Sequence, residues 1–143
     1  MVCGPKPDKE KGCKFLSFGI RDDPSWDIHM GDAWNCRGFS CDPSITHPSK
    51  LHAAVTFANV GLKMLRTNVE QRVDPQDKWI LTSLPKMQQF LTWDYIDIVK
   101  IDCEGCEVAM ARDILADDPS FLSKIGQISI ETHATRTWVN TTE

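Results

Sequence analysis

Residues 96–107 constrain the fold of this 143-residue chain more than any other segment. The first six, Ile-Asp-Ile-Val-Lys-Ile, are mainly apolar and β-branched, which is typical of a strand buried in a parallel sheet. An acidic turn, Asp-Cys-Glu-Gly-Cys-Glu, follows at 102–107, and apolar residues then recur at helical spacing. In an open α/β sheet, ligands bind beyond the carboxyl ends of the strands. We therefore expect the acidic turn to lie at a ligand-binding edge.

Strand and helix patterns alternate along the chain, which predicts an α/β fold with a doubly wound, mainly parallel sheet covered on both faces. Right-handed crossovers between parallel strands bring their carboxyl ends to one edge of the sheet. Strands are predicted at 14–19, 38–42, 54–60, 96–101 and 126–131, with a candidate extra strand at 79–82. Helices are predicted at 26–34, 49–54 and 83–91, and from residue 104 with a packed face of Val108, Met110, Ala111, Ile114 and Leu115.

Composition limits the classes of function. The formal net charge of −4 argues against nucleic-acid binding, which normally needs a basic face. No apolar run approaches the roughly 18–20 residues that span a bilayer, and the N-terminal residues lack the apolar core of a signal peptide. We predict no transmembrane segment in this chain. The compartment stays open, and a longer membrane-anchored or secreted form is compatible with the sequence.

Six cysteines, at positions 3, 13, 36, 41, 103 and 106, match no zinc template, so no metal site is predicted. Cys103 and Cys106 form a Cys-x-x-Cys at a helix start, where the helix dipole lowers a thiol pKa. The intervening Glu104 opposes that effect, so small buried fillers are favoured over a redox pair. Cys3 and Cys13 are close enough in sequence to bridge, but nothing in the sequence fixes that pairing.

Gly19 and Asp42 form the first candidate site. Gly19 ends the first strand and lets the backbone approach a ligand closely, and Asp42 follows the second strand 23 positions later. That separation is near the roughly 20 residues at which an acid reaches a nucleotide ribose. The turn has one glycine where a dinucleotide loop has three, and Asp22 and Asp23 disfavour a pyrophosphate. Nucleoside binding and an ordinary turn with a capping Asp are equally supported.

Acidic side chains at two further strand ends form the second candidate site. Asp102, Glu104 and Glu107 follow the fourth predicted strand, and Glu131 ends the fifth, two residues before His133. Helix capping explains one or two of the acids at 102, 104 and 107, whereas a functional site explains all three. A histidine at that edge can take up a proton near neutral pH. A surface histidine bonded to a neighbour is an equal alternative.

Four segments of the chain together resemble the FkbM-like methyltransferases, most closely their animal methyltransferase-like branch. They are residues 14–20, 39–44, 96–107 and 128–133, and their order and spacing match over residues 13–133. The resemblance implies an S-adenosylmethionine-dependent methyltransferase with a Rossmann-like fold. It implies cofactor contacts by Phe18, Gly19, Asp42 and Asp102, catalytic roles for Asp102, Glu104 and His133, and substrate contacts by Glu107 and Glu131.

The resemblance also sets expectations for domains and partners. We expect a polar lead-in at 1–13, a methyltransferase-like domain at 14–137 that lacks the family's C-terminal strand hairpin, and a tail at 138–143. The expected acceptor is a small molecule or a glycan, methylated on oxygen or nitrogen. The alternative function is a truncated, non-catalytic binding module of the same fold. The sequence does not predict which molecule is the acceptor, nor the oligomeric state.

Overall fold

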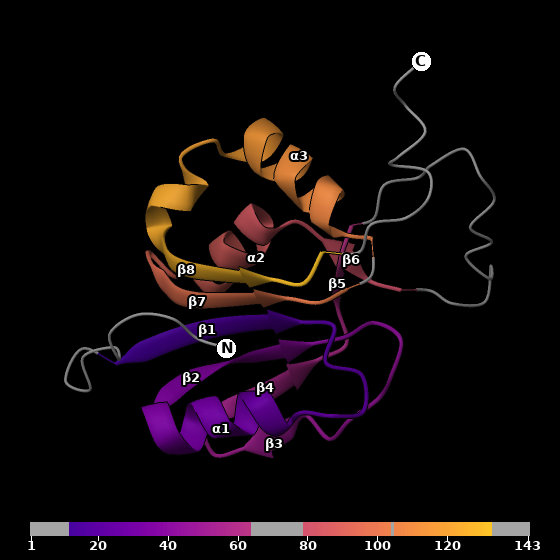
Figure 1. Cartoon of the computed structure of the whole chain (residues 1–143), viewed down its shortest axis with the longest axis vertical. Helices are drawn as coiled ribbons and strands as arrows, with labels where there is room; N and C mark the ends of the chain where they lie inside the picture. Colours follow the sequence, from indigo (N-terminus) through magenta and orange to yellow (C-terminus); the bar gives the residue numbers. More distant parts are fainter. Residues whose placement is uncertain (1–11, 64–78, 104, 133–143) are drawn as a thin grey trace.

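A computed structural model describes residues 12–63, 79–103 and 105–132 of the chain (Figure 1). Strands and helices alternate at both ends of these residues, whereas five strands follow one another between residues 36 and 82. The elements are β1 (Cys13–Phe18), α1 (Ser25–Trp34), β2 (Cys36–Cys41), β3 (Lys50–His52), β4 (Val55–Ala58), β5 (Gly61–Leu62), β6 (Leu81–Thr82), α2 (Leu84–Leu91), β7 (Ile96–Ile101), α3 (Glu107–Asp117), the 3-10 helix η1 (Phe121–Lys124) and β8 (Ile125–Ile130).

The main sheet has the strand order β3-β4-β2-β1-β7-β8, and β5 pairs with β6 in a separate two-stranded sheet. Only β3 runs antiparallel to its neighbour within the main sheet. Numbered along the chain, its parallel strands therefore lie in the order 3-2-1-4-5. The order reverses between β1 and β7, which is the switch point where ligands of doubly wound sheets bind. The expected α/β class is confirmed, with a mostly parallel sheet compatible with a Rossmann-like fold.

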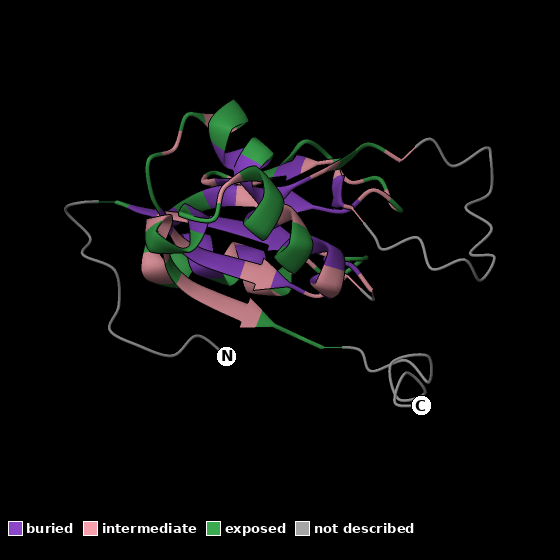
Figure 2. Ribbon diagram, turned by 90° about the horizontal axis from the view of Figure 1, so that it is seen from above, coloured by how far each residue is buried: buried purple, intermediate pink, exposed green. Residues whose placement is uncertain are grey.

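Each face of the sheet carries its own apolar core because side chains alternate along a strand. Phe15 packs with Met30 of α1 on one face, and Leu16 packs with residues of α2 and α3 on the other. Figure 1 shows α1 at the bottom of the molecule and α2 and α3 at the top. In Figure 2 the central strands are buried, whereas β8 is half-buried along most of its length.

The helix at 83–91 is confirmed, and its start follows from local chemistry. Ser83 precedes α2 and its side chain accepts a hydrogen bond from the Lys86 amide, at 3.4 Å. Pro85 lies in the first turn, where its missing N–H leaves no bond unmade. The strands at 14–19, 38–42, 96–101 and 126–131 are confirmed to within two residues of their predicted ends.

Two predictions about secondary structure are wrong. The expected helix at 49–54 is the strand β3, which pairs antiparallel with β4, because strand pairing outweighs the weak helical pattern of six residues. The last helix begins at Glu107 rather than 104, and Ala111 and Leu115 are exposed on it. Its buried apolar residues are Ala109, Met110 and Ile114. The segment 54–60 forms a shorter strand, β4, and β5 begins just beyond it.

The structure supplies the partner of Cys13, which the sequence left open. Cys13 and Cys36 are bonded, with an S–S distance of 2.04 Å, and join the first residues of β1 and β2. Cys103 and Cys106 are also paired; Cys106 is fully buried in the main core cluster and the half-buried Cys103 packs against it, which agrees with the expected filling role. The suggested partner of Cys13, Cys3, lies outside the described residues. Within the described ranges, no helix has the length and apolar character needed to cross a membrane.

Candidate functional site

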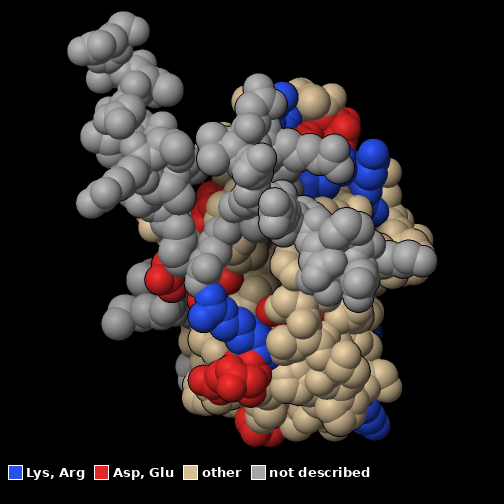
Figure 3. All heavy atoms as spheres, turned by 90° about the vertical axis from the view of Figure 1, so that its right-hand side faces the viewer, with Lys and Arg blue, Asp and Glu red and all other residues tan. Residues whose placement is uncertain are grey.

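The carboxyl ends of β1, β2, β7 and β8 bring four predicted residues to one edge of the sheet: Gly19, Asp42, Asp102 and Glu131. Backbone bonds extend the strand pairing to this edge. The Gly19 amide donates to Cys41 O at 2.9 Å, the Asp102 amide to Phe18 O at 3.0 Å, and the Glu131 amide to Ile101 O at 2.9 Å. Figure 3 faces this edge, where several acidic side chains are visible.

Gly19 is required by a close approach of two loops at the switch point. Its φ is +80°, and a Cβ built on it would lie 1.9 Å from the carbonyl oxygen of Asp102. No other residue type fits that distance. The preceding Phe18 is 1 % exposed and belongs to the core, so its side chain is not presented at the edge. The turn after β1 is therefore built directly against the turn after β7.

Asp42 is buried and bonded on both carboxylate oxygens. Oδ2 accepts a hydrogen bond from the Arg21 amide at 2.9 Å. Oδ1 accepts bonds from the amide of Ser44 at 2.8 Å and from its hydroxyl at 2.6 Å. The residue as a whole is 3 % exposed. This geometry matches the capping alternative: Asp42 joins the turn after β1 to the turn after β2.

Asp102 has a much more open environment. Its side chain is 34 % exposed, and its carboxylate lies 3.7 Å from Nζ of Lys100. Lys100 lies over the Trp26 ring of α1, with Nζ 6.0 Å from the ring centroid. Because the ion pair is long and partly solvated, it contributes little to the free energy of folding. The Asp102 carboxylate is therefore available to a ligand at the switch point.

Asp27 is a buried acid near this edge that the sequence analysis did not select. It lies in the first turn of α1, is 1 % exposed, and accepts a hydrogen bond from the Ser40 hydroxyl at 2.7 Å. Burial raises the pKa of the Asp27 carboxyl, while the Ser40 bond and the charge of Lys100 partly oppose that rise. Its position three residues before the buried Met30 was the available signal, since both lie on the inner stripe of α1.

Of the remaining predicted site residues, two lie within the described part of the chain and two lie outside it. Glu107 is 6 % exposed, and its Oε2 accepts a hydrogen bond from the Gly105 amide at 2.9 Å, which matches the capping alternative. Glu131 is exposed at the end of β8. Glu104 and His133 lie outside the described residues. No group of three potential metal ligands occurs in the part of the chain that the structure describes.

The edge thus combines a constrained glycine turn, a buried acid that joins two turns, and a partly exposed acid at the switch point. Negative charge at this point favours a ligand with a cationic group, since a carboxylate attracts and accepts hydrogen bonds from such a group. Comparison with known proteins adds no assignment: no family model, curated protein or solved structure matches this chain. The structural evidence for a function is therefore the fold and these residues.

Proposed function

We propose that this chain is an S-adenosylmethionine-dependent methyltransferase domain that acts on a small-molecule or glycan acceptor. The observation that carries the proposal is the meeting of the Gly19 turn with Asp102 between β1 and β7, where the strand order reverses. A doubly wound sheet binds its ligand at that point. The family resemblance of the sequence supplies the choice of cofactor.

The described residues fit one end of this cofactor better than the other. S-adenosylmethionine carries a sulfonium and an ammonium group, and the exposed carboxylate of Asp102 suits either cation. The ribose end fits less well, because both oxygens of Asp42 are bonded to Arg21 and Ser44. In this proposal Asp42 holds the turns around the nucleoside in place. Its Oδ1 can bind the ribose only if the hydrogen bonds from Ser44 break.

When bound, the cofactor would supply an electrophilic methyl group. The protein's own task is then to align the acceptor with it and, for a hydroxyl acceptor, to take up a proton. Asp102 and Glu131 follow the neighbouring strands β7 and β8 and are the described acids that we assign to this task. Glu104 and His133 keep their proposed catalytic roles from the sequence. The carboxylates of Asp42 and Glu107 already accept hydrogen bonds from backbone amides of the protein. This favours the alternative function, a binding module without turnover.

Calorimetry with S-adenosylhomocysteine tests the proposal. We expect the chain to bind this ligand, and Asp102→Ala to weaken binding at least about tenfold, equivalent to about 1.4 kcal/mol. Asp94→Ala is the matched control, because Asp94 is an exposed acid beside the opposite end of β7. Absence of binding, or equal effects of the two substitutions, would overturn the assignment. Transfer of a labelled methyl group then separates an enzyme from a binding module.

A further inference from the structure

We infer that Lys100 determines which ligands bind at this edge: its ammonium group holds the Asp102 carboxylate until a cationic ligand displaces it, and polar side chains beneath α1 then receive the ammonium. Lys100 belongs to β7 and precedes Asp102 by two residues. The two positions of the ammonium are a property of the chain itself. Only the identity of the displacing ligand rests on the proposed function.

The outer position of the ammonium is the one that the structure shows. Nζ of Lys100 lies 3.7 Å from Oδ2 of Asp102, and the two side chains are 23 % and 34 % exposed. At that distance the groups attract each other without a direct hydrogen bond. Because the pair is partly solvated, it is weak and can be broken at small cost. A ligand cation that approaches Asp102 meets the ammonium as a like charge, so the two compete for one carboxylate.

The inner position lies on the face of the sheet that carries α1. Ser40, Ser17 and Lys100 are directly paired residues of β2, β1 and β7, so they form one row across three strands and project from the same face. Ile98, two residues before Lys100, belongs to the same core cluster as Met30 of α1. The side chain of Lys100 therefore starts on the α1 side of the sheet, beside Ser17.

Asp27 gives this row of polar residues its negative charge. The residue is 1 % exposed, and its Oδ1 accepts a hydrogen bond from the Ser40 hydroxyl at 2.7 Å. Burial raises the pKa of the Asp27 carboxyl, and the hydroxyls of Ser40 and Ser17 and the charge of Lys100 partly oppose that rise. The Ser17 hydroxyl is fully buried and lies near Asp27, yet it completes no hydrogen bond within the described residues. Its oxygen can therefore accept a bond from the ammonium.

The Trp26 ring lies between the two positions in character: it is apolar, yet it attracts a cation. Nζ of Lys100 is 6.0 Å from the ring centroid, within reach of a cation–π contact, and Asp27 follows Trp26 in the first turn of α1. Asp23 precedes the helix; the hydrogen bonds from Ser25, and to a smaller extent the charge of Lys100, lower the pKa of its carboxyl. One ammonium thus serves two acids near the start of α1 and one acid after β7.

The titration of Asp27 tests the two positions without any ligand. Carboxyl-carbon NMR signals are followed against pH, and the Asp27 signal is identified by its absence in Asp27→Asn. Lys100→Met should raise the pKa of Asp27 because a nearby cation is lost, whereas Asp102→Asn should lower it because the ammonium turns inward. Burial, and then the charges of Asp27 and Asp42, raise the pKa of the Cys41 thiol, so Cys41 stays neutral and does not disturb this titration.

The double variant separates a moving ammonium from a direct effect of the Asp102 charge. In the Lys100→Met background, Asp102→Asn should change the pKa of Asp27 much less, since no ammonium remains to turn inward. Equal effects of Asp102→Asn in the two backgrounds would overturn the inner position, because loss of the Asp102 charge alone would explain them.

Calorimetry tests the competition with a ligand. S-adenosylhomocysteine carries an ammonium group and should bind Lys100→Met at least about threefold more tightly than wild type, which is the worth of a partly solvated ion pair. Methylthioadenosine, the nucleoside without a cation, should bind both proteins equally. Lys14→Met is the matched control and should change neither affinity: Lys14 also extends from a strand over a tryptophan, with Nζ 5.6 Å from the Trp93 centroid, but it begins near the opposite end of the sheet.

Unchanged binding of S-adenosylhomocysteine by Lys100→Met would overturn the inference. Weaker binding would also overturn it, because Lys100 would then bind the carboxylate of the ligand and not compete with its ammonium. Either result, in a protein that binds the ligand, leaves the proposed function standing.

Asp27→Asn provides the opposite change. It removes the charge of the inner position, so the ammonium stays at Asp102 and S-adenosylhomocysteine should bind about twofold to threefold more weakly. In the Lys100→Met background the same substitution should leave the affinity unchanged. Weakening in both backgrounds would show a purely structural role for Asp27 and overturn the inference. If no variant binds either nucleoside, the proposed function fails, while the Asp27 titration still decides the two positions of Lys100.

Discussion

Asp42 and Asp102 follow the two strands that flank β1, yet their surroundings differ. Asp42 is almost completely buried and accepts three hydrogen bonds from neighbouring turns. Asp102 keeps a third of its side chain exposed, with Lys100 at 3.7 Å as its ion-pair partner. Each acid directly follows a strand that neighbours β1, but Asp42 holds the turns of the sheet edge together, whereas Asp102 is partly exposed at that edge. Position along a strand locates a site, and the surrounding turns decide what each residue does there.

The largest effect should come from Gly19, which lies between the two acids. Gly19→Ala places a methyl group 1.9 Å from the Asp102 carbonyl oxygen in a backbone with φ of +80°. We expect the free energy of unfolding to fall by about 3–5 kcal/mol in a urea titration. The matched control is Gly12→Ala. Gly12 has a φ of +71°, and a Cβ built on it has no atom within 4 Å, so this substitution introduces the backbone strain without a clash.

The control should lose only about 1 kcal/mol. Similar losses for the two glycine substitutions would show that the close approach of the two turns is absent in solution. The comparison between Asp42 and Asp102 would then lose its basis, because that approach brings Asp102 to the switch point.

An intermediate effect should separate the two acids directly. Asp42→Ala removes a buried carboxylate that accepts three hydrogen bonds from Arg21 and Ser44, which should lower the free energy of unfolding by about 2–4 kcal/mol. Asp102→Ala removes one long, partly solvated ion pair and should cost less than about 1 kcal/mol. Chemical denaturation of both variants measures the difference. Equal costs would contradict a structural role for Asp42 and an exposed, ligand-facing role for Asp102.

Strands and their shared edge were the most predictable part of the molecule. The run at 96–101 is mainly apolar, which predicts burial, and its length and β-branched residues fit a strand, which β7 confirms. The helix at 49–54 failed because β3 is a short edge strand whose conformation comes from pairing with β4. The partner strand β4 begins just after these six residues and is itself held by β2, so the six residues alone do not determine the pairing.

The candidate site was predictable in its location and less so in its detail. Parallel topology places Gly19, Asp42 and Asp102 together, whatever their side chains do. The burial of Asp42 depends on how Arg21 and Ser44 turn, and the burial of Asp27 depends on the docking of α1 against Ser40. The disulfide partner of Cys13 follows from the register of β1 and β2. Only the Ser44 bonds are local; the contacts of Asp42 with Arg21, of Asp27 with Ser40 and of Cys13 with Cys36 join residues 13 or more positions apart.

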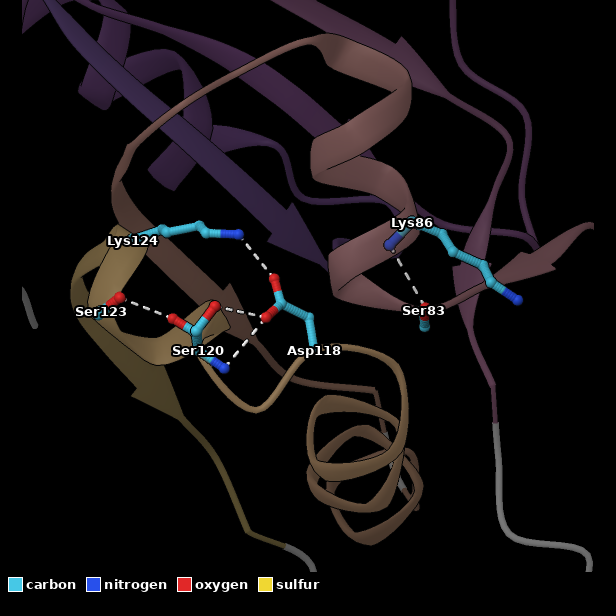
Figure 4. Close-up of polar contacts among 6 residues, drawn as sticks. All are labelled: Ser83, Lys86, Asp118, Ser120, Ser123 and Lys124. Carbon is cyan, nitrogen blue, oxygen red and sulfur yellow. Dashed lines mark hydrogen bonds and ion pairs between the residues drawn. The ribbon is translucent and has the colours of Figure 1, made fainter.

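The smallest effect should come from a third acid, Asp118, which has strong partners without a deep position. Its Oδ2 accepts a hydrogen bond from Nζ of Lys124 at 2.6 Å, and its Oδ1 accepts one from the Ser120 hydroxyl (Figure 4). These bonds, first that of Lys124 and then that of Ser120, lower the pKa of Asp118 below its ordinary 3.8. The contacts favour the carboxylate form in the folded protein.

A carboxyl whose pKa is lower in the folded than in the unfolded state stabilises the fold above the unfolded pKa. That contribution is lost as the pH falls through 3.8 toward the lower folded value. Asp118→Asn should therefore flatten the fall in melting temperature on acidification through this range, and change the neutral value little because the site is near solvent. Scanning calorimetry of wild type and variant across acidic pH provides the measurement. The contrary result is a loss of stability at neutral pH as large as that of Asp42→Ala. Hydrogen bonding without burial would then account for the role of Asp42. The difference between Asp42 and Asp102 would follow from their hydrogen-bond partners and not from their degree of burial.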